Sequence, residues 1–123
     1  MFSSKGERKM DALLGANSIF RGNISVKGTL RVDGQLEGDV ETDWLVLGEK
    51  GVVKGNISAK SVIVGGKVEG NVSASDSLEL ERKGSIEGDI RTAKLSVHEG
   101  GRLNGRATMG EGGSKIVELK QAQ

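Results

Sequence analysis

Few side chains in this sequence could perform chemistry. The single histidine, His98, directly follows the apolar residue Val97 in an alternating segment, so we expect an outward-facing surface side chain rather than a general base. The chain has no cysteine, which excludes thiolate nucleophiles, thiolate metal ligands and disulfides. The glycine-rich segment at residues 110–115 lacks the Gly-Lys-Ser/Thr order of a phosphate-binding loop. The sequence therefore predicts no catalytic, metal or cofactor site, and no enzyme.

The composition argues against a nucleic-acid-binding or membrane-spanning protein. The 18 basic residues are balanced by 17 acidic ones, and the chain has one Trp, two Phe and no Tyr. Nucleic-acid-binding proteins usually combine a strongly basic face with stacking aromatic side chains. The longest apolar run, Trp44–Leu47, is far short of the roughly 20 residues that span a membrane, and no signal peptide is recognisable. We therefore expect a cytoplasmic protein that does not bind nucleic acid.

A short motif recurs along the chain and divides it into repeats. Each copy reads Gly, then Asn or Asp, then Ile or Val, and the copies begin at residues 22, 38, 55, 70 and 88. Gly105-Arg106-Ala107 is a degraded sixth copy, and the spacings between the glycines are 16, 17, 15, 18 and 17 residues. Repeats of this kind are typical of solenoids, in which successive copies stack on one another. Asp39 and Asp89 hold the same motif position three copies apart, so they do not indicate paired catalytic carboxylates.

The apolar residues of each copy follow one spacing rule. In the first copy they are Ile24, Val26, Leu30, Val32 and Leu36, and over five copies the 25 positions hold 23 apolar residues and two threonines. Apolar residues two apart indicate strands with one inward face. The variable steps between the pairs indicate turns, because a one-residue slip inside a strand would turn its apolar face outward. The pattern predicts a coil with three short sides.

We therefore predict an all-β, single-domain fold: a parallel β-helix with a triangular cross-section and about six coils. The glycine motif would form the corner of constant length, since Gly tolerates positive φ and Asn and Asp bond to turn backbone. The β-helix domain spans residues 15–109 between short flexible tails at 1–14 and 110–123, where Lys9–Leu14 and Lys115–Ala122 could each form about two helical turns. Alternating charges along the first four coils are expected just before the fixed glycines, at Arg21, Glu37, Lys54 and Glu69.

The two ends of such a rod are the candidate interaction sites. Each end of a β-helix exposes unpaired backbone N–H and C=O groups around an apolar core, which is a template for a further strand unless it is covered. Two interpretations stay open: residues near the ends fold over and seal a monomeric adaptor rod, or rods stack end on end. The candidate contact residues are apolar and lie near the first and last coils: Leu13, Leu14, Ile19 and Phe20 upstream, and Leu103, Ala107 and Met109 downstream.

The repeated Gly-(Asn/Asp)-(Ile/Val) motif, in about six irregular coils between two short tails, resembles the bactofilins over roughly residues 15–109. The resemblance implies a right-handed β-helix and a bacterial cytoskeletal protein. It implies polymerisation without nucleotide into non-polar filaments, joined head to head and tail to tail through the end coils. It further implies a membrane-associated scaffold that serves cell-shape or cell-envelope processes and their client proteins at the cytoplasmic face of the inner membrane.

The amino-terminal residues resemble the short membrane-targeting peptide of many bactofilins, which implies that Met1, Phe2 and Lys5 contact an anionic membrane surface. One buried Phe contributes about 1.5 to 3 kcal/mol, and one basic residue near an anionic leaflet about 1 kcal/mol. A single tail would therefore bind weakly, whereas a filament that displays many tails would bind through avidity. The alternative is a solvated tail, as at most exposed termini.

A second candidate contact lies on the side of the rod. Val46 and Ile63 occupy outward positions on adjacent coils, with Trp44 at the nearby corner. They could form a lateral patch for bundling or for a partner protein. Single exposed apolar residues are also normal on protein surfaces, and this alternative stays open.

The rival function is that of a hexapeptide-repeat acyltransferase, whose fold is also a triangular β-helix. A hexapeptide coil needs repeats close to multiples of six residues, and only the interval from Gly70 to Gly88 complies. His98 has no evident catalytic partner in the sequence. The spacing therefore favours the cytoskeletal protein over the enzyme.

Overall fold

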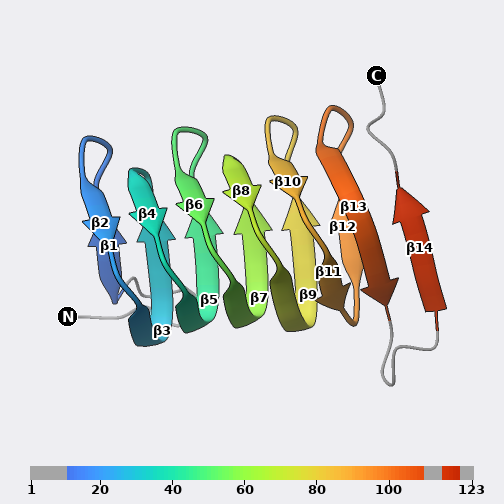
Figure 1. Cartoon of the computed structure of the whole chain (residues 1–123), viewed down its shortest axis with the longest axis horizontal. Helices are drawn as coiled ribbons and strands as arrows, with labels where there is room; N and C mark the ends of the chain where they lie inside the picture. The colour runs from blue at the N-terminus through green and yellow to red at the C-terminus, as the bar shows by residue number, and fades with distance from the viewer. Residues whose placement is uncertain (1–10, 110–114, 120–123) are drawn as a thin grey trace, which may run out of the picture.

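The computed structural model describes residues 11–109 and 115–119, with side chains described as far as Thr108. Within these ranges the chain forms strands and no helix (Figure 1), so no helix there is long and apolar enough to cross a membrane. The strands, in chain order, are β1 (Ala12–Leu14), β2 (Ile19–Arg21), β3 (Ile24–Val32), β4 (Gln35–Glu37), β5 (Val40–Leu47), β6 (Val52–Lys54), β7 (Ile57–Val64), β8 (Lys67–Glu69), β9 (Val72–Leu80), β10 (Ser85–Glu87), β11 (Ile90–Thr92), β12 (Leu95–Val97), β13 (Arg102–Met109) and β14 (Lys115–Leu119).

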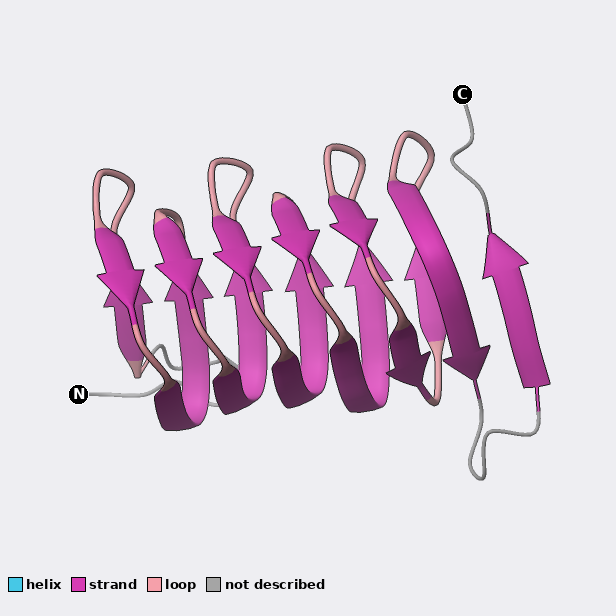
Figure 2. Ribbon diagram, in the orientation of Figure 1, coloured by secondary structure: helices cyan, strands magenta, loops and turns pink. Residues whose placement is uncertain are grey.

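Each coil has three straight sides, as the apolar spacing predicts. In a middle coil β5 supplies the first two, Val40–Thr42 (side 1) and Trp44–Leu47 (side 2), and β6 supplies side 3. Each side pairs in parallel with the equivalent residues of the next coil, and the coils stack along the long axis of the molecule (Figure 2). At the ends, β1 and β12 belong to side 2, β2 to side 3, and β13 runs from side 3 into side 1. The predicted parallel β-helix is confirmed.

The core consists of columns of inward side chains, one from each coil. On side 3 the column Leu36, Val53, Val68 and Ile86 has 0% exposure throughout. Every predicted core position of the second, third and fourth copies is buried, including Thr42, whose hydroxyl donates to the carbonyl oxygen of Gly28 at 3.0 Å. The predicted core positions that are not fully buried lie in the first and last coils: Ile24, Val26, Leu95 and Val97.

The corner between sides 3 and 1 is built from stacked glycines. Gly70 has φ of +144°, and a Cβ there would lie far inside van der Waals contact with the carbonyl oxygen of Gly55, one coil below. Only glycine fits, because a side chain would be strained by φ and blocked by the neighbouring coil. The same close approach repeats at Gly38, Gly55, Gly88 and Gly105. A φ between 134° and 148° is shared by all six corner glycines: Gly22, Gly38, Gly55, Gly70, Gly88 and Gly105.

The residue after each corner glycine forms a second ladder. The backbone N–H of Asp39 donates to Oδ1 of Asn23 at 3.0 Å, and that of Asn56 donates to Oδ1 of Asp39 at 3.2 Å. The ladder continues upward through Asn71 and Asp89, at 3.3 and 3.2 Å. The sequence predicted local turn bonds for these side chains; they instead bind the backbone of the next coil and so help to fix the stacking of the corner.

The predicted alternation of charges forms only at its first step. Arg21 pairs with Glu37 at 3.2 Å, whereas Glu69 pairs with Lys67 of its own strand at 3.1 Å. The described part of the chain has no ion pair from Lys54 to either neighbouring glutamate within 4.0 Å. Exposed pairs of this kind contribute little, about 0 to 1 kcal/mol, so the backbone ladders and not these charges fix the register.

The described residues of the two end segments that could form short helices form strands instead. Residues 12–14 form β1 in parallel with β3, and residues 115–119 form β14 in antiparallel with β13. Short segments have little intrinsic helical stability, whereas the open edges of the first and last coils offer backbone hydrogen bonds to any adjacent extended segment. Pairing with the open edge of the first or last coil therefore makes these segments strands rather than helices.

We predict that Gly70→Ala lowers the free energy of unfolding by about 2 to 4 kcal/mol, from the strain at positive φ and the clash with Gly55. Chemical denaturation followed by circular dichroism measures it. Gly15→Ala is the matched control, because a Cβ at Gly15 would approach only Oγ of Ser18 at 3.9 Å. Equal stability of the two variants would contradict the glycine ladder.

Candidate assembly interface

The N-terminal end of the rod presents apolar side chains that no further coil covers within the described residues. Its outermost strands are β1 on side 2, β2 on side 3 and the start of β3 on side 1. The inward side chains of these strands pack against the core but are only partly buried. We call this set the N-terminal end cluster: Ala12, Leu14, Phe20, Ile24 and Val26.

Two predicted contact residues at this end face outward instead. Leu13 lies in register with Arg31 on the outer surface of side 2, and Ile19 lies in register with Gln35 on the outer surface of side 3. They are 57% and 61% exposed. They therefore flank the end cluster rather than belong to it, whereas Leu14 and Phe20 lie at the end as the sequence predicted.

The C-terminal end is partly covered by β14. This strand pairs antiparallel with Gly105–Met109 of β13, and Ala107 beneath it, opposite Val117, has 0% exposure. Leu103 completes the side 3 core column above Ile86 and is 4% exposed. Neither Leu103 nor Ala107 has side-chain surface to offer a second chain in this arrangement. Met109 ends β13, and its side chain lies outside the described part.

Among the described side chains, the exposed apolar surface at this end lies on β12 instead. Val97 continues the side 2 core column above Leu80, but no described strand lies beyond it on that side, and it is 45% exposed. Leu95 of the same strand is partly buried. We call Leu95 and Val97 the C-terminal end cluster. Spacing could not reveal it, because Val97 has the same spacing as a buried residue and only the number of coils on each side decides its exposure.

The predicted lateral patch is small. Val46 and Ile63 lie in register on adjacent coils of side 2 and are partly buried, as is Trp44. Charged residues bound the pair along the same column, with Arg31 on one side and Glu79 on the other. A lateral contact through these residues stays a prediction.

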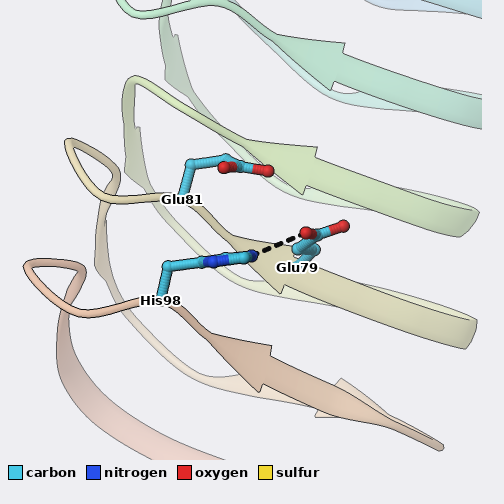
Figure 3. A group of neighbouring side chains, drawn as sticks. All are labelled: Glu79, Glu81 and His98. Carbon is cyan, nitrogen blue, oxygen red and sulfur yellow. Dashed lines mark hydrogen bonds and ion pairs between the residues drawn. The ribbon is translucent and has the colours of Figure 1, made fainter.

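His98 is exposed, as the sequence predicted, but it has a partner that the sequence did not suggest. Its Nε2 lies 2.7 Å from Oε2 of Glu79 on the preceding coil, with Glu81 alongside (Figure 3). The hydrogen bond to Glu79, supported by the negative charges of Glu81 and Glu79, raises the pKa of His98 above its ordinary value. A histidine paired with a carboxylate on an exposed surface does not by itself indicate a catalytic site.

A groove of about 840 Å³ runs along side 1 beside the Asn/Asp ladder. Small polar side chains, including Ser25, Ser58 and Ser73, line it together with Arg91 and Arg106. It is a by-product of the repeat, because small outward residues follow the ladder on successive coils. Met1, Phe2 and Lys5, and the glycine-rich residues 110–114, lie outside the described residues.

Comparison with known proteins identifies the family. A family model described as "Bactofilin: Polymer-forming cytoskeletal" matches residues 12–108. The chain belongs to the bactofilin family. Two curated relatives are bactofilins of Myxococcus xanthus: BacP is 34% identical over 82% of this chain, and BacO is 28% identical over 80% of it. The chain spans 42% of the length of BacP and 79% of that of BacO.

Two solved bactofilin structures share the fold of this bactofilin. One is a cryo-EM reconstruction of double helical filaments of the Thermus thermophilus bactofilin, with a TM-score of 0.75 and 27% identity over 80% of this chain and 99% of that one. The other is a solid-state NMR structure of the cytoskeletal bactofilin BacA, with a TM-score of 0.72 and 30% identity over 91% of this chain and 98% of that one. The predicted family and fold class are confirmed.

Leu103 is buried in the core, whereas Val97 is largely exposed, so substitutions at the two positions should affect stability differently. We predict that Leu103→Ala lowers the free energy of unfolding by about 2 to 5 kcal/mol, as for other buried leucines, because it leaves a cavity under the last coil. Val97→Ser should change it by no more than about 0.5 kcal/mol. Chemical denaturation of both variants measures the difference. A Leu103→Ala protein as stable as the parent would show that the end of the core is open at Leu103.

Proposed function

We propose that this bactofilin polymerises end to end, without nucleotide, into non-polar filaments. The observation that carries the proposal is that the apolar core reaches both ends of the rod incompletely covered, at the N-terminal and C-terminal end clusters. Each end also presents strand edges that no other described strand pairs with, and such edges can bind a further strand. A second chain would bury the apolar side chains and pair with the strand edge. No step of this assembly needs a bound ligand.

The two ends differ, and this difference favours contacts between like ends. The N-terminal end cluster has five side chains from all three sides, whereas the C-terminal end cluster has two side chains from β12 alone. A symmetric joint brings the same patch of both chains together, so it has to be self-complementary. Two apolar ends of equal size and shape meet this condition, as in the head-to-head and tail-to-tail contacts that the resemblance implies.

The joints should differ in strength. Burial of an apolar side chain contributes up to about 1.5 to 3 kcal/mol, whereas association costs an estimated 4 to 15 kcal/mol. The five residues of the N-terminal end cluster can offset a large part of this cost, and the two of the C-terminal end cluster cannot do so without backbone pairing. We therefore expect the N-terminal joint to form first and the C-terminal joint to limit polymer length.

Single charged substitutions distinguish non-polar from polar filaments. We predict that Phe20→Glu and Val97→Lys each convert filaments to dimers joined through the unaltered end, with the Val97→Lys dimer stable at lower concentration. In a head-to-tail filament either change would block every joint and give monomers. Analytical ultracentrifugation and electron microscopy of protein without added nucleotide measure this.

The matched controls introduce the same charges one residue away on the outer face of the same strands. Ile19→Glu and Ser96→Lys should leave filaments intact, since both positions face away from the core column. Loss of filaments in these controls, or full-length polymers in both test variants, would contradict the assignment of the end clusters.

We further propose that the filaments lie on the cytoplasmic face of the inner membrane, through Met1, Phe2 and Lys5, as a non-enzymatic scaffold for cell-shape or cell-envelope processes and their client proteins. The support is the family membership and the resemblance of the first residues to a membrane-targeting peptide. A filament would display one tail from each chain, so weak single contacts would add to firm binding.

Deletion of residues 1–8 tests the membrane proposal. We predict unchanged filaments by electron microscopy and at least about tenfold less co-sedimentation with anionic liposomes. The deletion removes the tail from every chain, so the filament loses its multivalent membrane binding. Phe2→Ala with Lys5→Ala in the full chain should reproduce the loss. Equal liposome binding by the truncated filaments would place the membrane contact elsewhere.

One observation favours a second candidate, the capped adaptor rod. β14 covers the side 1 edge at the C-terminal end by antiparallel pairing, as a cap would. The cap is partial, because β12 on side 2 and Arg102–Asn104 of side 3 have no further described strand beyond them. Persistent monomers at high concentration of the unaltered chain would favour this alternative.

A further inference from the structure

Three potential metal ligands converge on the outer surface near the C-terminal end. Glu79 and Glu81 lie two residues apart where β9 ends and turns, and His98 lies directly after β12 on the next coil (Figure 3). One ligand atom from each residue lies within 4.8 Å of the other two, and Nε2 of His98 is 2.7 Å from Oε2 of Glu79. Backbone pairing holds the two coils together here, since the N–H of His98 donates to the carbonyl oxygen of Leu80 at 2.8 Å.

The fold does not require these residue types. The position of Glu81 and His98 is occupied by glycine in two other coils, at Gly48 and Gly65, which make the same backbone bond to the coil below. In those two coils the outward position that corresponds to Glu79 is occupied by Val46 and Ile63. In the first coil the equivalent positions hold Arg31 and Asp33, which pair with each other at 2.9 Å. Carboxylates and a histidine come together at these positions in the last two coils of side 2.

The cluster also carries negative charge that the described residues balance only in part. The one ion pair formed by either glutamate is that between Glu79 and His98, whose side chains are 40% and 42% exposed. No lysine or arginine within the described ranges lies within 4.0 Å of the carboxylate of Glu81. With a neutral imidazole the site has two negative charges and one nitrogen donor, which suits a divalent cation.

We propose that Glu79, Glu81 and His98 form a binding site for Zn²⁺ or a similar divalent transition-metal ion. Imidazole nitrogen and carboxylate oxygen bind Zn²⁺ at about 2.0 to 2.2 Å, and three protein ligands with an open position are a common set. Mg²⁺ and Ca²⁺ prefer oxygen ligands alone, so the histidine discriminates against them. All three side chains are at the surface, and small rotations suffice to replace the His98–Glu79 hydrogen bond by bonds to the metal.

A metal at this site would join the last strand of side 2 to the coil below. His98 follows β12 directly, and β12 carries Val97 of the C-terminal end cluster. Within the described residues β12 pairs with β9 alone, so one of its two edges has no strand beside it. Bound metal would restrict its opening and hold the C-terminal end cluster in place.

The experiment is a titration of the full chain with Zn²⁺ at pH 8, in competition with a chromophoric chelator, together with Co²⁺ absorption spectra. We expect one saturable site per chain. Glu79→Gln, Glu81→Gln and His98→Gln should each weaken it by at least about tenfold, and Zn²⁺ should slow hydrogen exchange over residues 95–101. Glu99→Gln, which removes an adjacent carboxylate outside the cluster, should leave the affinity within about threefold.

Each alternative result overturns the site. Absence of saturable Zn²⁺ binding, unchanged binding in His98→Gln, or equal losses in Glu99→Gln and the three ligand variants would each do so. Equal competition by Mg²⁺ would identify a general counter-ion site without a role for imidazole. Circular dichroism of each variant verifies that the coils are intact, and these exposed substitutions are not expected to disturb them.

Discussion

The structure depends on the exact stacking of one coil on the next at the corner between sides 3 and 1. There the glycine of each coil approaches the carbonyl oxygen of the glycine below so closely that no side chain fits. Beside it, the N–H groups of four ladder residues donate to the Asn or Asp side chain of the coil below: Asp39, Asn56, Asn71 and Asp89. This contact fixes the register of all three sides, because the other two corners vary in length. The uniform inward columns follow from it.

Translational stacking also explains why the proposed assembly contacts lie at the ends. Every inner coil covers its neighbours on both sides, so its apolar residues reach 0 to 2% exposure with few exceptions. The first and last coils have the same residue types and only one neighbour. The core is therefore continuous along the rod and incomplete at Phe20 and Val97. These are the places where we propose that a second copy of the chain binds.

Much of this fold could be predicted from the sequence, and the missing parts share one physical cause. The apolar spacing predicted the three sides and the buried columns because each inner residue meets the same environment in every coil. Residues of the first and last coils do not meet this repeated environment, because they have a neighbouring coil on one side only. Spacing assigned both Val97 and Leu103 to the core, and the position of Leu103 near the end also made it a contact candidate; the structure exposes Val97 and buries Leu103. The strand at residues 115–119 and the contact of His98 with Glu79 both depend on tertiary neighbours.

X-ray fibre diffraction from aligned filaments tests the central claim most directly. If coils stack along the rod and rods join end on end, the spacing between strands of about 4.8 Å lies along the filament axis and gives a strong meridional reflection. An equatorial 4.8 Å reflection would show that the rods lie across the filament and associate through their sides. Absence of the reflection from well-aligned filaments would contradict the stacked coil itself.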